Sequence, residues 1–374
     1  MKIAIIGTTA QSLLGFRGDM IKVLVEKGYE VYAFCIDYTD TYRNKVKGIG
    51  AIPVDYHLSR TGINAIKDMQ NTYWLYKKLK DIRVDVCFSY FSKPAIFGSL
   101  AAYFAQTPKI VAMLEGLGYS FTEQPEGIRF KTKIIKKIQV LLYKIAFKHI
   151  HALIVLNHDD KKDLLQLKCI EKSKIIVLGG IGLNMESYKK SPAPTSPISF
   201  IFVGRFLKEK GINEFISAAK IIKAKYNEVE FNILGNIDPE NPGSLTKIEL
   251  DRLIMDGDFN FPGFVDNVAE WISKSSVFVL PSYREGFPRS TQEAMAIGRA
   301  IITTNVPGCK DTVNDGLNGF IVDRWSSIAL ANSMEKFVLD KNLISQMGDE
   351  SFRIAVEHFD TKIVTEKVIN ILKL

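Results

Sequence analysis

Short apolar runs alternate along this chain with longer segments in which apolar residues recur at helical spacing. In the first half, the apolar runs predict strands at 3–7, 31–36, 84–89, 110–114 and 153–156. Helical patterns lie between them, the clearest at 63–80 and 94–105. Continuous apolar strands that alternate with amphipathic helices are typical of a parallel sheet covered by helices on both faces.

A second series of the same kind follows a proline- and serine-rich break, KKSPAPTSP at 189–197. Its predicted strands lie at 199–203, 229–234, 259–261, 277–280 and 300–303, and its predicted helices at 213–225, 244–255, 268–273 and within 326–374. The pattern predicts two Rossmann-like, doubly wound α/β domains at 1–190 and 191–355, with a cleft between them. A C-terminal helix at 356–374 can pack back on the N-terminal domain.

The 374 residues carry a formal net charge of +8, and the excess of lysine and arginine lies in residues 1–190. A basic half can meet nucleic acid or an anionic membrane surface. Four cysteines stand far apart without metal-like spacing, which favours reduced core cysteines in a cytosolic protein. The start, MKIAIIG, is too short for a signal peptide, and no stretch reaches the roughly 20 apolar residues that span a bilayer.

The stretch PSYREGFPRSTQEAMAIG at 281–298 joins a predicted strand to a predicted helix. Pro288 suits the first helical position, so the amides of the next three residues would face an anion such as a phosphate. Glu285 and Glu293 bracket this helix start and could hold hydroxyl groups, which together describes a sugar nucleotide. The alternative is that these carboxylates only favour the helix dipole.

The predicted strand at 199–203 runs into GRFLKEKG, where Gly204 permits a sharp turn. Arg205 and Lys210 would place positive charge at the carboxyl end of this strand, near Glu285 if the strand is central. The alternative is that the lysines of this loop are merely solvated. After the next strands, Phe264 and Val265 could offer a flat apolar face and backbone groups to a base, although PGF is also a common turn.

Two loops of the first half also follow predicted strands, at 8–18 and at 115–118. The first could let backbone amides approach a diphosphate, although it matches neither a dinucleotide-binding fingerprint nor a P-loop. In the second, Glu115 stands where reacting groups often lie. An ordinary turn and a capping glutamate are the respective alternatives.

Residues 127–151, GIRFKTKIIKKIQVLLYKIAFKHIH, contain many basic residues and no acidic one. Helical spacing aligns apolar residues on one stripe, namely Ile134, Ile138, Leu141, Leu142 and Ile145. Such a helix can lie on an anionic leaflet, where each lysine near the surface contributes about 1 kcal/mol. A core-packed helix with a solvated basic back is the alternative. The absence of acids favours membrane contact.

Taken together, GRFLKEKG, PGFVDNV and VLPSYREGFPRSTQEAMAIGRAII resemble the GT-B retaining glycosyltransferases of family 4. Glu285 and Glu293 match the E-x7-E motif of that family, and the order of motifs agrees over nearly the whole chain. GFR in the first loop and LEGLG after an inner strand resemble the PglA-like branch. Members of that branch are bacterial N-acetylgalactosaminyltransferases that act on polyprenyl-diphosphate-linked sugars.

The resemblance implies that Arg205 and Lys210 neutralise the donor diphosphate, Glu285 holds the transferred sugar and Glu293 holds the ribose. Glu115 stands where many family members have a catalytic-domain histidine, and we assign it to the acceptor side. Further donor contacts are expected from Gly15, Gly204, Phe264, Val265, Gly286, Phe287, Pro288, Arg289, Ser290 and Thr291. Acceptor or membrane contacts are expected from Arg17, Arg129, Lys131, Lys133, Lys136 and Lys137.

The sequence therefore predicts a retaining glycosyltransferase that moves an N-acetylhexosamine, such as GalNAc or GlcNAc, from a UDP-sugar. The expected acceptor is a saccharide linked to a polyprenyl diphosphate such as undecaprenyl diphosphate, in bacterial capsule, O-antigen or other glycan assembly. We expect a cytoplasmic enzyme that is peripheral on the inner face of the membrane. It should need no cofactor and no metal, since no DxD-like cluster stands at a strand end.

Three alternatives remain. The chain could be a soluble GT-B transferase or a GT-B epimerase of sugar nucleotides. A protein that binds nucleic acid through its basic half is less favoured, because no binding motif is present and the interleaving residues are aliphatic.

Overall fold

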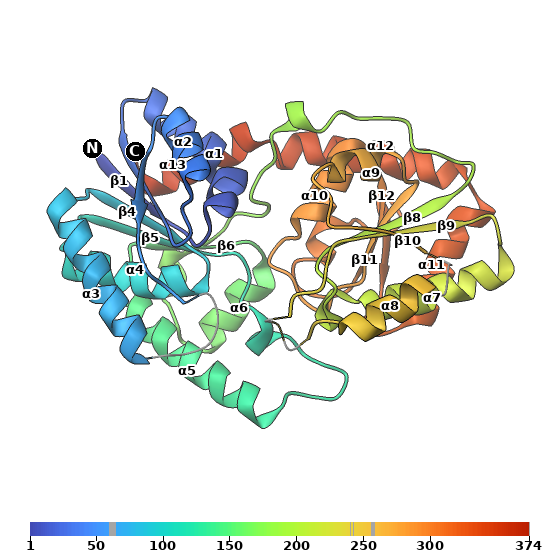
Figure 1. Ribbon diagram of the computed structural model, residues 1–374, viewed down its shortest axis with the longest axis horizontal. Coiled ribbons are helices and arrows are strands. Elements are labelled where there is room, and N and C mark those ends of the chain that lie inside the picture. The colour runs from blue at the N-terminus through green and yellow to red at the C-terminus, as the bar shows by residue number, and fades with distance from the viewer. Residues whose placement is uncertain (60–64, 240, 242, 256–258, 374) are drawn as a thin grey trace. The chain divides into compact units, whose positions relative to one another are not determined.

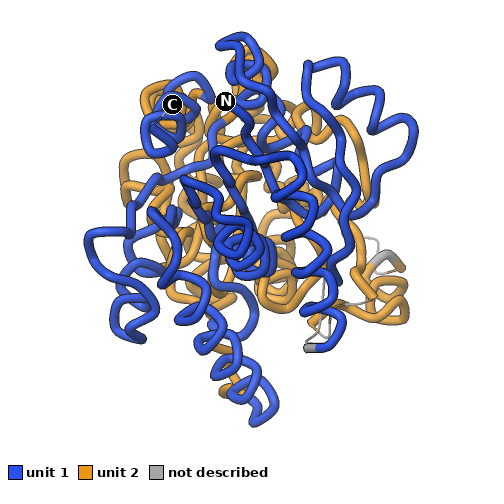
Figure 2. Tube along the Cα trace, turned by 90° about the vertical axis from the view of Figure 1, so that its left-hand side faces the viewer, with its two compact units in different colours: residues 1–121, 129–182, 361–374 blue, residues 122–128, 183–360 orange. Residues whose placement is uncertain are grey.

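The computed structural model describes residues 1–59, 65–239, 241, 243–255 and 259–373. The chain folds into two compact units, which Figure 2 shows in two colours. Unit 1 comprises Met1–Phe121, Arg129–Gly182 and Thr361–Leu374, and unit 2 comprises Thr122–Ile128 and Leu183–Asp360. The start of the helix predicted at 63–80 and the last residue of the chain lie outside the described residues.

The chain leaves unit 1 after Gly182, whereas the sequence predicted the boundary between the two domains at residue 190. The reason is that the segment after Gly182 hydrogen-bonds within unit 2: the Leu183 amide donates to the Phe359 carbonyl at 2.7 Å. The chain returns to unit 1 after Asp360. The segment predicted at 356–374 therefore begins in unit 2 and continues in unit 1.

Unit 1 is built on a parallel sheet of seven strands in the order β3-β2-β1-β4-β5-β6-β7. The strands are β1 (Lys2–Ile6), β2 (Glu30–Cys35), β3 (Ile52–Asp55), β4 (Val86–Tyr90), β5 (Lys109–Leu114), β6 (Ala152–Val155) and β7 (Ile175–Val177). The order reverses between β1 and β4, which is the arrangement of a doubly wound sheet.

Helices cover both faces of this sheet. They are α1 (Ala10–Glu26), α2 (Asp40–Gly48), α3 (Ala65–Ile82), α4 (Ser92–Phe104), α5 (Phe130–Phe147), α6 (His158–Gln166) and α13 (Thr361–Leu372). Helices α1, α2 and α13 lie on one face, and α3, α4 and α5 lie on the other (Figure 1). The residues of β4 and nearly all of β1 and β5 are buried, as a sheet covered on both faces requires.

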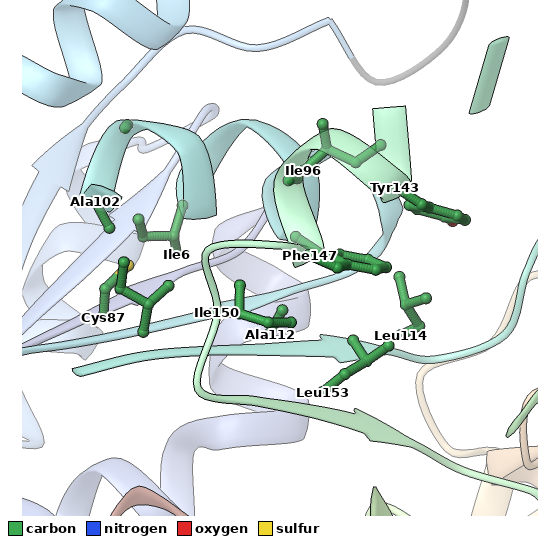
Figure 3. Close-up of a cluster of buried hydrophobic side chains, with 14 of the residues drawn as sticks. Ile6, Cys87, Ile96, Ala102, Ala112, Leu114, Tyr143, Phe147, Ile150 and Leu153 are labelled. Atoms are coloured by element: carbon green, nitrogen blue, oxygen red, sulfur yellow. The ribbon is translucent and has the colours of Figure 1, made fainter. Parts of the chain in front are cut away.

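A buried apolar cluster fills the space between this sheet and helices α4 and α5. Figure 3 shows Ile96 on α4 with Tyr143 and Phe147 on α5, above Ala112 of β5 and Leu153 of β6. Full burial of an aliphatic or phenylalanine side chain contributes about 2 kcal/mol relative to exposure. The cluster therefore fixes α4 and α5 on the sheet.

Unit 2 is built on a parallel sheet of six strands in the order β10-β9-β8-β11-β12-β13. The strands are β8 (Ser199–Val203), β9 (Glu230–Leu234), β10 (Asn260–Gly263), β11 (Val277–Leu280), β12 (Ala300–Thr304) and β13 (Gly319–Val322). The helices are α7 (Ile212–Lys225), α8 (Lys247–Met255), α9 (Val268–Ser273), α10 (Arg289–Ile297), α11 (Ser327–Leu339) and α12 (Asn342–His358). Helices α7, α8 and α11 lie on one face, and α9, α10 and α12 lie on the other (Figure 1).

The strands that the sequence did not predict are β3, β7 and β13, and each stands at a sheet edge. An edge strand is paired on one side only, so its side chains are partly exposed, as the burial of these strands shows. Of the three, β3 lacks a continuous apolar run, whereas β7 and β13 contain short ones that were not predicted as strands.

Candidate functional site

The strand order of unit 2 reverses between β8 and β11. From this point the chain winds outward through β9 to β10 on one side and through β12 to β13 on the other. In such sheets the loops after the two strands at the reversal diverge, and ligands bind beyond them. These two loops contain the motifs predicted to bind the donor, at 204–211 and 281–288.

Lys210 and Glu285 come from the two loops and form an ion pair. Lys210 Nζ lies 2.5 Å from Glu285 Oε1, and the side chains are 23% and 12% exposed. The hydroxyl of Ser282 donates to the same carboxylate oxygen at 2.7 Å. A cation and a carboxylate thus meet at the strand reversal, and the sequence did not indicate the part of Ser282.

Glycines let the two loops approach each other closely. Gly211 has a φ of +74°, and a Cβ at this position would lie 2.0 Å from the Pro281 carbonyl oxygen. A Cβ at Gly308 would lie 2.4 Å from the Glu285 carbonyl oxygen. The Glu285 amide donates to the Pro307 carbonyl at 3.0 Å. Backbone contact therefore holds Lys210 and Glu285 in place.

Arg205, the second predicted cation, contacts a different carboxylate. Its Nη1 donates to Asp238 Oδ2 at 2.7 Å, on the segment after β9, and its side chain is 57% exposed. Gly204, just before Arg205, follows β8, and its amide donates to the Leu234 carbonyl at 3.0 Å. Of the two predicted cations, Lys210 contacts Glu285 and Arg205 contacts Asp238.

Helix α10 begins at Arg289, and Pro288 is its N-cap with φ −65° and ψ 122°. The sequence predicted that Pro288 is the first residue of the helix. Its extended ψ instead makes it the residue before the helix. The first helical hydrogen bond runs from the Gln292 amide to the Pro288 carbonyl at 3.3 Å. The amides of Arg289, Ser290 and Thr291 therefore precede the helical ladder.

Two buried polar atoms stand in the first turn of α10. Among the described residues, Thr291 Oγ1 and Gln292 Oε1 have no hydrogen-bond partner, although both side chains are fully buried. Buried polar atoms are nearly always paired in folded proteins. Gln292 carried no signal in the sequence, because glutamine is an ordinary helix residue.

Glu293 is held by two donors. The Tyr188 hydroxyl donates to Glu293 Oε1 at 2.8 Å, and Arg289 Nε donates to the same atom at 2.9 Å. Burial and the nearby Glu293 carboxylate raise the pKa of Tyr188 to about 12, so its hydroxyl keeps its proton. Tyr188 lies just before the proline-rich segment, where no periodic pattern pointed to it.

The remaining predicted donor contacts of unit 2 differ in exposure. Gly286 is buried, and Phe287 packs edge-on against Phe359 with ring centroids 5.3 Å apart. Phe264, just beyond β10, is 68% exposed, and Val265 beside it is half-buried. Phe287 therefore anchors the loop after β11 by its contact with Phe359, whereas the ring of Phe264 is accessible to solvent.

Glu115 and Arg17 form a buried ion pair in unit 1, with side chains 9% and 5% exposed. The Arg17 guanidinium also lies over the ring of Tyr90, 4.8 Å from its centroid. Glu115 follows β5 and Tyr90 ends β4, which is the strand next to the reversal. Arg17 was predicted among the acceptor and membrane contacts. Because its side chain is buried, Arg17 does not form part of a surface that could contact a membrane.

The loop predicted at 8–18 is largely helix. Helix α1 starts at Ala10, where Thr9 Oγ1 accepts from the Ser12 amide at 3.2 Å and Asp37 accepts from the Ala10 amide at 2.7 Å. These two caps begin the helix earlier than the apolar spacing suggested. Gly15 is therefore an exposed position on α1 rather than part of a loop.

The basic segment predicted at 127–151 forms helix α5, which turns Tyr143, Ala146 and Phe147 toward the core. The predicted apolar stripe stays largely exposed: Leu141 is 57% exposed, and Ile134 and Ile145 are exposed by nearly half. The predicted basic contacts Arg129, Lys131, Lys133 and Lys137 are exposed, and Lys136 lies over the ring of Phe121 at 4.4 Å. Within the described residues, no helix has the length and apolarity to cross a membrane.

All four cysteines are buried and unbridged, as predicted. Burial raises the pKa of the Cys87 and Cys309 thiols to about 12, so both remain protonated. Across the residues that the structure describes, no group of three or more histidine, cysteine, aspartate or glutamate side chains could hold a metal ion.

Family models match both units. A model described as glycosyl transferases group 1 matches residues 185–353, and a model described as glycosyl transferase 4-like matches residues 2–157. The chain is a glycosyltransferase. The stretch 185–353 contains the sheet of unit 2, and the stretch 2–157 contains β1 to β6 of unit 1, so the predicted family is confirmed.

Relatives of this glycosyltransferase act on sugars of several kinds. It is 28% identical to the N,N'-diacetylbacillosaminyl-diphospho-undecaprenol alpha-1,3-N-acetylgalactosaminyltransferase of Campylobacter jejuni, over 99% of this chain and 98% of the relative. It is 26% identical to the capsular polysaccharide biosynthesis glycosyltransferase CapM of Staphylococcus aureus, over 98% and 95%. It is 28% identical to the UDP-Gal:alpha-D-GlcNAc-diphosphoundecaprenol alpha-1,3-galactosyltransferase of Escherichia coli, over 75% and 73%.

Solved structures share the fold. HepE of Anabaena in complex with UDP matches this glycosyltransferase with a TM-score of 0.77 at 17% identity, over 100% of both chains. Sucrose-phosphate synthase from Thermosynechococcus elongatus matches with a TM-score of 0.78 at 16% identity, over 100% of this chain and 98% of the other. The GT-B fold with two parallel-sheet domains, predicted from the sequence, is confirmed.

Proposed function

We propose that this glycosyltransferase moves an N-acetylhexosamine from a UDP-sugar to a saccharide linked to polyprenyl diphosphate, in the assembly of a bacterial surface glycan. The match to the Campylobacter jejuni relative carries the proposal, because it spans 99% of this chain. The name of that relative specifies an N-acetylgalactosamine donor group and a diphospho-undecaprenol acceptor. The Escherichia coli relative also names a UDP-sugar and a diphosphoundecaprenol acceptor.

The donor would bind at the strand reversal of unit 2. The Lys210 ammonium and the amides that precede the ladder of α10 would face its diphosphate. Glu285 would accept hydrogen bonds from the transferred sugar and Glu293 from the ribose.

The reaction would proceed with retention of configuration at the anomeric carbon. The bond from that carbon to the diphosphate oxygen breaks, and the acceptor oxygen bonds to the carbon on the same face. The proton of the acceptor hydroxyl passes to the departing diphosphate oxygen. Lys210 and the amides of α10 would stabilise the charge that develops on the diphosphate, so that no metal is needed.

The acceptor would bind to unit 1. Glu115 would accept a hydrogen bond from the acceptor saccharide, and Arg17 would hold the Glu115 carboxylate in place, because both are buried in one ion pair. Helix α5 would rest on an anionic membrane, since its apolar stripe and its lysines are exposed. The enzyme would thus work at the inner face of the cell membrane.

The purified enzyme should be incubated with UDP-GalNAc, UDP-GlcNAc, UDP-Gal and a GDP-sugar. Each donor is paired with a polyprenyl-diphosphate-linked sugar, with the corresponding free sugar, and with no acceptor. We expect transfer from a UDP-N-acetylhexosamine to the lipid-linked sugar, and an alpha linkage in the NMR spectrum of the product.

Other outcomes would favour the alternative functions. If kcat/KM for the free sugar equalled kcat/KM for the lipid-linked sugar, a soluble transferase would be favoured. Conversion of the donor without any acceptor would favour an epimerase. A beta linkage from an alpha-linked donor would contradict retention.

A further inference from the structure

Helices α3, α4 and α5 enclose a pocket of about 570 Å³ in unit 1. The three helices lie on the same face of the sheet (Figure 1). Ile96 and Phe97 of α4 and Ile135 and Leu142 of α5 supply apolar parts of the lining. A space of this size, walled mainly by carbon, suits an apolar chain.

The pocket also has a charged part, formed by α3 and the start of α4. Lys93 Nζ lies 3.3 Å from both carboxylate oxygens of Asp68 and 2.5 Å from the Ser59 hydroxyl. The side chain of Asp68 is 3% exposed and that of Lys93 is 18% exposed. Because Lys93 offsets the charge of Asp68, the further lysine in the lining, Lys131, makes the pocket net positive.

Helix α4 begins in this charged part, and the first turn of α5 adds Lys131 to the lining farther along the pocket. Helix α4 starts at Ser92 and α5 at Phe130, and neither N-cap makes a side-chain hydrogen bond. Neither first turn contains an acidic residue. A helix N-terminus carries partial positive charge, and Lys131 in the first turn of α5 adds to it, which favours an anion there. The pocket therefore combines an apolar wall with a site suited to phosphate.

Hydrogen bonds connect the pocket to the loop that follows Glu115. Gln139, in the pocket lining, donates to the Leu117 carbonyl at 3.2 Å and accepts from the Ser120 hydroxyl at 2.5 Å. It also donates to the Tyr143 hydroxyl at 2.7 Å, which donates to Ser92 Oγ at 3.1 Å. The pocket and the Glu115 loop are therefore parts of one network.

We propose that this pocket binds the isoprenoid chain nearest the diphosphate of the acceptor, with that diphosphate at Lys131 and the start of α5. The inference rests on the proposed function and names the lipid subsite of the same acceptor. The pocket thus supplies an apolar wall for the lipid and positive charge for the diphosphate, and Gln139 connects it to the loop that follows Glu115. Exposed Phe130, at the start of α5, continues the apolar surface outside the pocket.

The test compares two water-soluble acceptors that carry the same diphosphate sugar. One bears a farnesyl chain and the other an ethyl group, so that neither requires a membrane. In the wild type, we expect kcat/KM for the farnesyl acceptor to exceed that for the ethyl acceptor at least roughly tenfold, because several methylenes become buried.

Ile135→Trp should narrow the pocket, and Ile134→Trp is the matched control because Ile134 neighbours it on α5 without lining the pocket. Ile135→Trp should remove most of the preference for farnesyl, while activity with the ethyl acceptor and KM for the UDP-sugar stay unchanged. Ile134→Trp should retain the preference. Thermal unfolding verifies that both variants are folded.

The outcomes separate the two levels of inference. Transfer to neither acceptor by the wild type would contradict the proposed function itself. Equal use of both acceptors, or an equal effect of both tryptophan variants, would overturn the pocket alone. A benzophenone placed on the farnesyl chain should label peptides of α4 or α5 in the wild type, and labelling confined to other segments would also overturn the pocket.

Discussion

At the scale of single residues, the candidate donor site depends on one ion pair and the groups that fix it. Glu285 is largely buried, and Lys210 and Ser282 bind the same oxygen of its carboxylate. A carboxylate with this little exposure needs a partner. Lys210 therefore both holds Glu285 and presents positive charge at the strand reversal.

Lys210→Met should lower kcat by roughly a hundredfold or more, because one preorganised positive group is lost from the departing diphosphate. Lys208→Met is the control, since Lys208 lies in the same loop and belongs to none of the contacts described for Glu285. Steady-state kinetics with the best donor and acceptor measure the effect. Wild-type kcat in Lys210→Met would remove this lysine from the mechanism.

Gly211→Ala should destabilise unit 2 by about 1–3 kcal/mol, because φ is positive and the added Cβ would meet the Pro281 carbonyl oxygen. Gly18→Ala is the contrasting variant. Gly18 lies inside α1 with no atom within 4 Å of a built Cβ, so alanine should stabilise the helix by about 0.5–1 kcal/mol. Urea unfolding of both variants measures whether each change raises or lowers the free energy of unfolding. A neutral Gly211→Ala would show that the loops can separate.

At the scale of elements, α5 presents its lysines and its apolar stripe on the outside of unit 1. The double change Lys133→Gln, Lys137→Gln should weaken binding to phosphatidylglycerol vesicles by about 2 kcal/mol, since each lysine near an anionic surface contributes about 1 kcal/mol. Lys247→Gln with Lys341→Gln removes the same charge from exposed positions of unit 2. Sedimentation with vesicles measures the difference. Equal binding by both double variants would contradict a membrane role of α5.

The start of β12 is tied to two other segments by Arg299, which is fully buried. Its guanidinium donates to the carbonyls of Ile272 at 3.0 Å, Ser273 at 3.0 Å and Ser191 at 2.9 Å. Burial lowers the pKa of Arg299 to about 10, so it stays charged at neutral pH. The arginine thus attaches the proline- and serine-rich segment to unit 2.

Arg299→Met should destabilise the protein by about 3 kcal/mol or more, because several buried carbonyls lose their donor while the volume changes little. Arg252→Met, on the exposed side of α8, should change stability by less than about 0.5 kcal/mol. Urea unfolding followed by circular dichroism distinguishes the two. A small effect of Arg299→Met would mean that other groups replace the lost donors.

At the scale of the whole molecule, the chain crosses between its two units more often than a simple two-domain order requires. Residues 122–128 belong to unit 2, where Glu123 and Arg324 form an ion pair of 2.5 Å, and the final helix belongs to unit 1. Two halves that exchange segments in this way are not separable at one cut.

Treatment of the intact enzyme with EDTA should leave transfer unchanged, because positive side chains and helix amides are proposed to meet the diphosphate in place of a metal. The measurement is kcat before and after chelation, followed by addition of Mg²⁺ or Mn²⁺. Loss of activity that either ion restores would contradict this part of the proposal.

The sequence by itself determined the class of fold and the location of the donor motifs. Inner strands are buried on both faces, so they appear as continuous apolar runs, and motifs at strand ends follow from them. The edge strands β3, β7 and β13 and the early start of α1 escaped this reasoning, because these strands are partly exposed and the helix is capped by a distant Asp37. Local pattern cannot report such contacts.

Only the tertiary structure decided which side chains meet. Lys210 reaches Glu285 because β8 and β11 are neighbours, although the two residues stand far apart in the sequence. In the same way, Arg17 meets Glu115, Tyr188 meets Glu293, and three helices close around an apolar pocket. The order of strands in a sheet is a long-range property, and it chooses partners that no window of sequence contains.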